Sequence, residues 1–216
     1  MELVVILWMV AALLIGYLLG SINFGVIVSR CIYHEDVRTK GSGNAGTTNI
    51  LRTYGKKAAA LTLAGDMLKG VVAVLLCRYV ASAVLANPQY GIYAGYVAAI
   101  GAVCGHLWPV WFGFKGGKGI AVAAGAILAS EPVVLAALLA VFILIVLISR
   151  IVSLASVIVA ILYPVFTVIW SLHTQRSTVF TGICTVIMAI LVVWMHRANI
   201  KRLMNGTEYK FGEKKQ

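Results

Sequence analysis

Long apolar runs separated by short polar segments make up most of the chain. The first run, Leu3 to Ser29, has no charged residue and is long enough as a helix to cross a hydrocarbon core about 30 Å thick. It lacks a charged n-region and exceeds the h-region of a signal peptide, so we predict a first transmembrane helix. Six further runs follow: Ala58–Ala86, Tyr90–Phe112, Ile120–Ser130, a run ending at Ile148, Ile151–Leu172 and Thr178–Met195. The pattern predicts an all-α polytopic membrane protein with seven transmembrane helices.

The middle of the chain allows a second interpretation. The run from Ile120 to Ser130 is short for a span, and Glu131-Pro132 follows it. This dipeptide either forms an outer turn between two helices or kinks one long span from Ile120 to Ile148. Arg150 favours the turn, because a hairpin that goes out and returns puts this cation on the inner side. If the short middle helices do not cross, five spans remain.

Charge sets the orientation of these spans. The chain is 61% hydrophobic and 12% charged, which excludes an ordinary soluble domain, and its net charge is +11. With seven spans, 15 of the 18 Lys and Arg residues lie on one side, and Lys69, Arg78 and Arg176 are the exceptions. The positive-inside rule therefore predicts an outer N-terminus and a cytoplasmic C-terminus. We expect a single membrane domain over residues 1–216 with a polar tail at 206–216, and no nucleic-acid partner.

The first candidate binding segment is "GSGNAGTTNILR", Gly41 to Arg52. Its glycines let backbone N–H groups approach a ligand, and its hydroxyl and amide side chains lead to the fixed charge of Arg52. A helix that begins at about Thr47 or Thr48 would add the N-terminal end of its dipole, which favours anions. The alternative is a flexible connection between two helices.

The second segment, "GHLWPVWFGFKGGKGIAVA", runs from Gly105 to Ala123. It fits neither the P-loop nor the dinucleotide-binding pattern. Its glycines can form a concave nest of N–H groups, and Lys115 and Lys118 can neutralise anionic oxygens. The aromatic residues are typical of an interfacial belt, and His106 can equally be structural.

The third segment, "HRANIKRLMNGTE", places His196 and Asn199 on one helical face. Within the second span, Asp66 and Lys69 are three positions apart and can pair, either as part of a functional site or as a structural ion pair. The four cysteines and seven acidic residues form no metal-binding pattern, so we expect neither a metal nor a cofactor.

In this order, and in a chain of this length, the three segments resemble the motifs of the PlsY family, the bacterial acyl-phosphate-dependent glycerol-3-phosphate acyltransferases. The resemblance implies transfer of a fatty acyl group from acyl phosphate to the 1-hydroxyl of sn-glycerol 3-phosphate. The products are lysophosphatidic acid and phosphate, in the first acylation step of phospholipid synthesis. It also implies a bacterial inner-membrane enzyme whose active site faces the cytoplasm and whose partners are these two substrates and membrane lipids.

The resemblance also suggests roles for individual residues. Ser42 and Arg52 match essential positions, the glycines of "GGKG" match a phosphate-binding loop, His196 and Asn199 match active-site positions, and Glu208 matches a structural one. We therefore predict Ser42, Arg52, His196 and Asn199 as catalytic. We assign substrate binding to other residues in and near the motifs: Gly43, Asn44, Gly46, Thr48, Asn49, Lys69, His106, Lys115, Gly116, Gly117, Lys118, Gly119 and Ser153.

The chemistry suggested by these residues is a direct transfer. Acyl phosphate is already an activated anhydride, and the sequence shows neither a Ser/His/Asp arrangement nor an HxxxxD motif. We expect the substrate hydroxyl to attack the acyl carbonyl, with either His196 or a substrate phosphate as the base. A transporter of a small organic phosphate is the main alternative and a lipid-binding scaffold the third; the absence of an internal repeat argues against a transporter.

Overall fold

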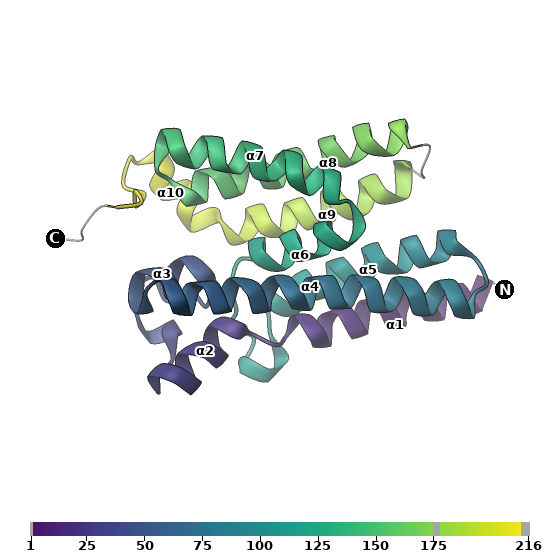
Figure 1. Cartoon of the computed structure of the whole chain (residues 1–216), viewed down its shortest axis with the longest axis horizontal. Coiled ribbons are helices and arrows are strands. Elements are labelled where there is room, and N and C mark those ends of the chain that lie inside the picture. The colour runs from purple at the N-terminus through teal and green to yellow at the C-terminus, as the bar shows by residue number, and fades with distance from the viewer. Residues whose placement is uncertain (1, 175–177, 213–216) are drawn as a thin grey trace. The chain divides into compact units, whose positions relative to one another are not determined.

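The computed structural model describes residues 2–174 and 178–212, which contain helices and no strand (Figure 1). The all-α prediction is confirmed. Arg176 of the predicted outer turn, and Lys214 and Lys215 of the tail, lie outside the described residues. The elements are α1 (Glu2–Gly20), α2 (Phe24–Tyr33), η1 (Val37–Thr39), α3 (Thr47–Tyr54), α4 (Lys56–Val84), α5 (Pro88–Leu107), η2 (Val110–Phe112), α6 (Ile120–Ser130), α7 (Pro132–Ser149), α8 (Val152–His173), α9 (Thr178–Met195) and α10 (Arg197–Met204).

Several of these helices are built to lie in a membrane. Within the described part of the chain, five helical segments are long and apolar enough to cross a bilayer: Glu2–Tyr33, α4, Pro88–Phe112, α7 and α8. The pair α9 and α10, which is bent by 60°, makes a sixth if it counts as one span. Helix α6 is apolar but has only 11 residues. The chain is therefore a multi-pass membrane protein.

The first predicted span differs from the prediction of one continuous helix. Helix α1 ends at Gly20 and α2 begins at Phe24. The side chain of Asn23 accepts a hydrogen bond from the backbone N–H of Val26 (3.2 Å) and caps α2. The predicted first span is present as the candidate span Glu2–Tyr33, but its helix is broken between Gly20 and Phe24.

The helix break predicted at Glu131-Pro132 is present. Helix α6 ends at Ser130 and α7 begins at Pro132, the first helical position, where proline lacks only an N–H that would be unpaired anyway. The same break divides the chain into two compact units, Met1–Ser130 and Glu131–Gln216. Each unit is described by itself below.

Close helix packing through glycines shapes the first unit. Gly16 and Gly20 of α1 lie against the backbone of α5, and Gly101 and Gly105 of α5 lie against the backbone of α1. A Cβ atom at any of the four positions would overlap a carbonyl oxygen of the other helix. Both pairs have the GxxxG spacing that lets membrane helices approach closely. This contact sets the position of His106, one residue beyond Gly105.

Helix α6 packs against α4 in the same way. Gly70 of α4 lies against the backbone of Val122, and Gly125 of α6 lies against the backbone of Met67. The close contact fixes the start of α6, and with it the glycine-rich segment that precedes this helix.

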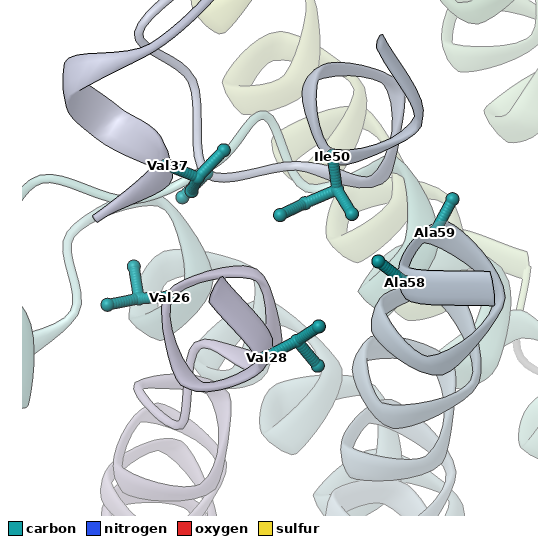
Figure 2. Packing of buried hydrophobic residues seen from close by; sticks show 7 residues of the cluster. Val26, Val28, Val37, Ile50, Ala58 and Ala59 are labelled. Carbon is teal, nitrogen blue, oxygen red and sulfur yellow. The ribbon is translucent and has the colours of Figure 1, made fainter. Parts of the chain in front are cut away.

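A small apolar core supports the first candidate segment (Figure 2). It joins α2, η1, α3 and the first turn of α4, and Tyr33, Tyr54 and Phe112 pack around it. The buried side chains are Val26, Val28, Val37, Ala45, Ile50, Ala58 and Ala59. Because Ala45 and Ile50 belong to the segment Gly41–Arg52, this core holds that loop in a defined conformation.

The second unit consists of α7 to α10 and the segment that follows. Helix α8 packs against both α7 and α9, and α10 contacts α8 and α9. Two polar contacts join these helices in their apolar interior: Thr167 donates to the carboxyl group of Glu131 (2.8 Å), and the hydroxyls of Ser171 and Thr181 lie 3.3 Å apart.

Candidate active site

The first candidate loop is organised by the side chain of Asn49. Its Oδ1 accepts the backbone N–H of Ser42 (2.8 Å), and its Nδ2 lies within 3.2 Å of the carbonyl oxygens of Val37, Lys40 and Asn44. Asn49 is 2% exposed, so these contacts replace water at a buried amide. Asn49 therefore holds the backbone of this loop in its conformation.

The other predicted residues of this loop lie around that amide. Asn44 caps the turn by accepting the backbone N–H of Gly46 (2.9 Å), and Gly43 has φ of +72°, a conformation that favours glycine. Helix α3 begins at Thr47, as predicted, and includes Thr48 in its first turn. Ser42 and Arg52 are exposed, in contrast to the buried Asn49.

The second candidate loop lies against the end of α5. Gly117 donates its backbone N–H to the carbonyl oxygen of His106 (3.0 Å), and a Cβ atom at 117 would overlap the His106 ring. A Cβ at Gly116 would overlap the carbonyl oxygens of His106 and Leu107. Gly119 has φ of +89° and directly precedes α6. These glycines are needed for close packing on α5 as well as for the loop conformation.

The loop glycines were expected to offer their backbone N–H groups to an anion, and Gly117 does not fit this expectation. Its N–H is already bonded to a protein carbonyl, so the nest for an anion must use other donors of the loop. Lys115 is exposed and Lys118 is partly buried, and the N-terminus of α6 follows directly. Cationic side chains and a helix N-terminus remain a suitable arrangement for phosphate oxygens.

Beneath this loop lies a buried group of ionisable side chains. Lys69 Nζ is 2.8 Å from Asp66 Oδ1 and 2.9 Å from His106 Nδ1, and it donates to the carbonyl oxygen of Ile22 (2.6 Å). All three side chains are at most 4% exposed. The predicted Asp66–Lys69 pair is confirmed. The pair also accounts for the helix break after Gly20, because the break leaves the carbonyl oxygen of Ile22 available to accept a hydrogen bond from the buried ammonium group.

The His106 ring lies against both charged groups. Its Nδ1 is 2.9 Å from Lys69 Nζ and 3.5 Å from Asp66 Oδ1. Nε2 is the ring atom nearest to the position of a Cβ at Gly117. Lys69 and His106 were predicted to bind substrate. In the structure His106 contacts the loop at Gly117 and Lys69 contacts His106, so both support the loop.

Arg38, which was not among the predicted site residues, connects the two loops. Its Nη1 donates to the carbonyl oxygens of Phe112 (2.6 Å) and Lys115 (3.0 Å), while Nε and Nη2 donate to the carboxylate of Asp36 (2.9 and 2.7 Å). The hydrogen bonds from Arg38 hold the pKa of the Asp36 carboxyl far below its ordinary value, and Arg30 lowers it further. The carboxylate is therefore ionised at any pH near neutrality.

The third segment is organised around Glu208. Its Oε1 accepts hydrogen bonds from Asn199 Nδ2 (2.7 Å) and Ser153 Oγ (2.9 Å), and its Oε2 pairs with Arg202 (2.7 Å). Burial by itself would raise the pKa of Glu208, but the three hydrogen bonds outweigh it and lower the pKa below the ordinary value. Glu208 thus fixes the predicted site residues Asn199 and Ser153, which agrees with a structural role.

His196 lies at the bend between α9 and α10. Its Nδ1 is 2.8 Å from the carbonyl oxygen of Val192, and the residue is 3% exposed. Because a carbonyl oxygen only accepts, Nδ1 carries the ring proton and Nε2 is the basic nitrogen of the neutral ring. Asn199 is also buried, three residues further on.

The structure therefore brings the predicted residues together in two groups. In the first unit, Asn49 of the loop Gly41–Arg52 donates to the carbonyl groups of Val37 and Lys40, and Arg38 between them donates to Lys115 of the glycine-lysine loop Gly113–Gly119. In the second unit, Asn199 of α10 and Ser153 of α8 form one cluster around the Glu208 carboxylate. Among residues 2–174 and 178–212, no three His, Cys, Asp or Glu side chains are placed to hold a metal ion.

Comparison with known proteins decides the family. Residues 10–206 match the family model described as glycerol-3-phosphate acyltransferase. The chain belongs to this family. A glycerol-3-phosphate acyltransferase of Clostridioides difficile is 46% identical over 202 residues, 94% of this chain and 95% of the relative. Another, from Agrobacterium fabrum, is 43% identical over 203 residues, 94% of this chain and 92% of the relative.

Two solved structures resemble this acyltransferase family member closely. Both are crystal structures of PlsY, an integral membrane glycerol 3-phosphate acyltransferase. The glycerol 3-phosphate form gives a TM-score of 0.81 at 36% identity and covers 94% of this chain and 96% of its own. The lysophosphatidic acid form gives 0.78 at 35%, covering 94% and 95%. The resemblance derived from the three motifs is confirmed.

Proposed function

We propose that this protein transfers a fatty acyl group from acyl phosphate to the 1-hydroxyl of sn-glycerol 3-phosphate, releasing lysophosphatidic acid and inorganic phosphate. The observation that carries the proposal is the match along nearly the whole chain to PlsY in a form with glycerol 3-phosphate. The acyl-phosphate donor comes from the resemblance of the three motifs to that family. Both substrates carry phosphate, which suits the cationic loops described above.

The residues of the first unit suit phosphate binding. Arg52, Lys115 and Lys118 supply positive charge, and the exposed Ser42 supplies a hydroxyl donor. In this proposal they hold the phosphate of glycerol 3-phosphate and stabilise charge on the departing phosphate. The Asn49 amide and the buried Lys69–His106 pair hold the two loops in shape. Fixed donors of this kind lower the barrier because they need no reorganisation during the reaction.

The residues of the second unit suit activation of the attacking hydroxyl. The hydroxyl oxygen attacks the acyl carbonyl carbon, the C–O bond to phosphate breaks, and the hydroxyl proton passes to a base. In this proposal His196 Nε2 accepts the proton, since Nδ1 is bonded to the carbonyl oxygen of Val192. A phosphate oxygen of a substrate is the other acceptor. In this proposal Asn199, which donates to Glu208, is the second catalytic residue of this unit.

For the membrane, we propose the seven-span topology, with an outer N-terminus and with both loops and the C-terminal segment in the cytoplasm of a bacterial inner membrane. Helix α6 is short at about 16 Å, but it is packed closely against α4 through Gly70 and Gly125. Irregular backbone at membrane depth is tolerated where protein covers it. In this proposal the end of the glycine-lysine loop next to α6 reaches membrane depth, where Gly117 and Gly119 are buried.

The test of the donor is a comparison of three acyl donors with purified protein in detergent and labelled glycerol 3-phosphate. Acyl phosphate should support formation of lysophosphatidic acid, and acyl-CoA and acyl carrier protein should not. Equal or faster turnover with acyl-CoA would exclude the proposed donor while leaving the acyltransferase assignment in place.

A further inference from the structure

The two arms of the Arg38 guanidinium group bind different parts of the first unit. One side forms a two-point hydrogen bond with Asp36, and the other donates to the carbonyl oxygens of Phe112 and Lys115. The Arg38 side chain is 18% exposed and that of Asp36 20%, so water competes only partly for these bonds. We call this arrangement, the side chains of Asp36 and Arg38 with the two carbonyl groups, the Asp36–Arg38 clamp.

The clamp encloses a strained turn. Between the two bound carbonyl groups lie Gly113, with φ of +67°, and Phe114, with φ of +59°. A left-handed backbone is unfavourable for a residue with a side chain, and it persists where surrounding contacts impose it. The Arg38 contacts on either side of the turn supply such contacts. Without these hydrogen bonds, we expect the turn that precedes Lys115 and Lys118 to leave this unfavourable backbone conformation.

The backbone segment that carries Arg38 is also hydrogen-bonded to the first loop. The backbone carbonyl groups of Val37 and Lys40, on either side of Arg38, both accept from the Asn49 amide. The same amide accepts the N–H of Ser42. Hydrogen bonds of Asn49 therefore connect Ser42 to the backbone of residues 37–40, and the Arg38 side chain connects that segment to Lys115.

We propose that Arg38, oriented by Asp36, is a positioning residue that holds the glycine-lysine loop in the conformation that binds glycerol 3-phosphate. This inference rests on the proposed function. Arg38 acts through backbone groups of the loop, so its loss weakens binding of glycerol 3-phosphate more than it slows the chemical step. A lysine cannot replace it, because one ammonium group lacks the planar fork that reaches the carboxylate and the carbonyl groups together.

Arg30 provides a matched control. It donates to the same Asp36 carboxylate (2.8 Å), yet its side chain is 55% exposed and, in the described part of the chain, bonds to Asp36 alone. Arg30→Ala and Arg38→Ala remove the same charge from the same cluster. If the cluster acted only through its charge, both variants would change KM for glycerol 3-phosphate equally. The positioning role predicts a rise in KM in Arg38→Ala alone.

The experiment measures KM for glycerol 3-phosphate and kcat at saturating acyl phosphate, together with amide hydrogen exchange of residues 113–119. Arg38→Ala and Arg38→Lys should raise KM about tenfold, as expected for losing charge-assisted hydrogen bonds, with kcat nearly unchanged and faster exchange in the loop. Arg30→Ala should match the wild type in both measurements.

Two results would overturn the inference. One is an unchanged KM in a folded Arg38→Ala variant; the other is an equal rise in KM in Arg30→Ala. If Arg38→Ala does not fold, Asp36→Asn replaces it, because this change keeps the side-chain shape and should raise KM to a smaller extent; an unchanged KM in Asp36→Asn then overturns the inference. A wild-type protein that forms no lysophosphatidic acid would instead defeat the proposed function itself.

Discussion

The ring of His106 occupies the space that a side chain at Gly117 would need, and the His106 carbonyl oxygen accepts the Gly117 N–H (3.0 Å). This contact fixes the glycine-lysine loop on the end of α5. Because Lys69 Nζ lies 2.9 Å from Nδ1 of the same ring, the loop conformation is linked to the buried ion pair with Asp66. The loop is therefore held by His106 at Gly117 and by Arg38 at Lys115.

Gly117→Ala tests the contact with His106. The added methyl group overlaps the ring, and overpacking of this kind costs about 1–3 kcal/mol unless the loop moves. We expect a rise in KM for glycerol 3-phosphate of about tenfold as the loop shifts. Gly182→Ala is the control, because a Cβ there meets Val168 at an ordinary 3.5 Å. Equal kinetics in the two variants would contradict the role given to this contact.

Lys69→Met tests the buried ion pair. The substitution leaves the Asp66 carboxylate buried without its cation, a change that costs about 3–5 kcal/mol in comparable buried pairs. Thermal unfolding in detergent should show a large loss of stability, partly recovered in the double variant Asp66→Leu with Lys69→Met. Lys57→Met, at an exposed position of the same helix, should have little effect. A single Lys69→Met variant as stable as Lys57→Met would exclude a stabilising pair.

The acid range tests the Glu208 contacts. The folded-state pKa of Glu208 lies below its ordinary value of 4.5, so its carboxylate stabilises the protein above that pH. This contribution is lost as the pH falls through the lower folded-state pKa. The stability difference between wild type and Glu208→Gln should thus be constant near neutral pH and shrink below pH 4.5. Asp36 also titrates in acid, but it is common to both proteins and cancels. A difference that does not depend on pH would contradict the account.

His196→Ala tests the base. If Nε2 accepts the hydroxyl proton, kcat should fall by about 10²–10⁴ with both substrates saturating, while the protein remains folded. His173→Ala, at an exposed position in the last turn of α8, should leave kcat unchanged. Turnover that survives nearly intact in His196→Ala would exclude His196 as the base.

Local features of the fold could be predicted from the sequence. The start of α3 at Thr47, the helix break at Glu131-Pro132 and the Asp66–Lys69 pair each depend on residues a few positions apart. A glycine at the N-cap position of α3, proline geometry and helical spacing determine such features without reference to the rest of the chain. The three motifs identified the family because their order and spacing extend over the whole sequence.

Contacts between distant segments were missed. Arg38 and Phe112 are 74 positions apart, so nothing near Arg38 in the sequence distinguishes it from a cation on a cytoplasmic surface. The division of the first span at Asn23 was also missed, although an asparagine before Phe24 is a recognisable N-cap signal. The GxxxG spacings at Gly16 and Gly101 offered a signal for the contact between α1 and α5 that could have been used.

The central claim is acyl transfer from acyl phosphate to glycerol 3-phosphate, and the most direct measurement is product stoichiometry. Purified protein is incubated with both substrates, and inorganic phosphate and lysophosphatidic acid are quantified in the same samples. The account predicts that the two products appear in equal amounts and that neither forms when glycerol 3-phosphate is omitted. Folded protein that forms neither product, but carries glycerol 3-phosphate into liposomes, would contradict the account and indicate a transporter.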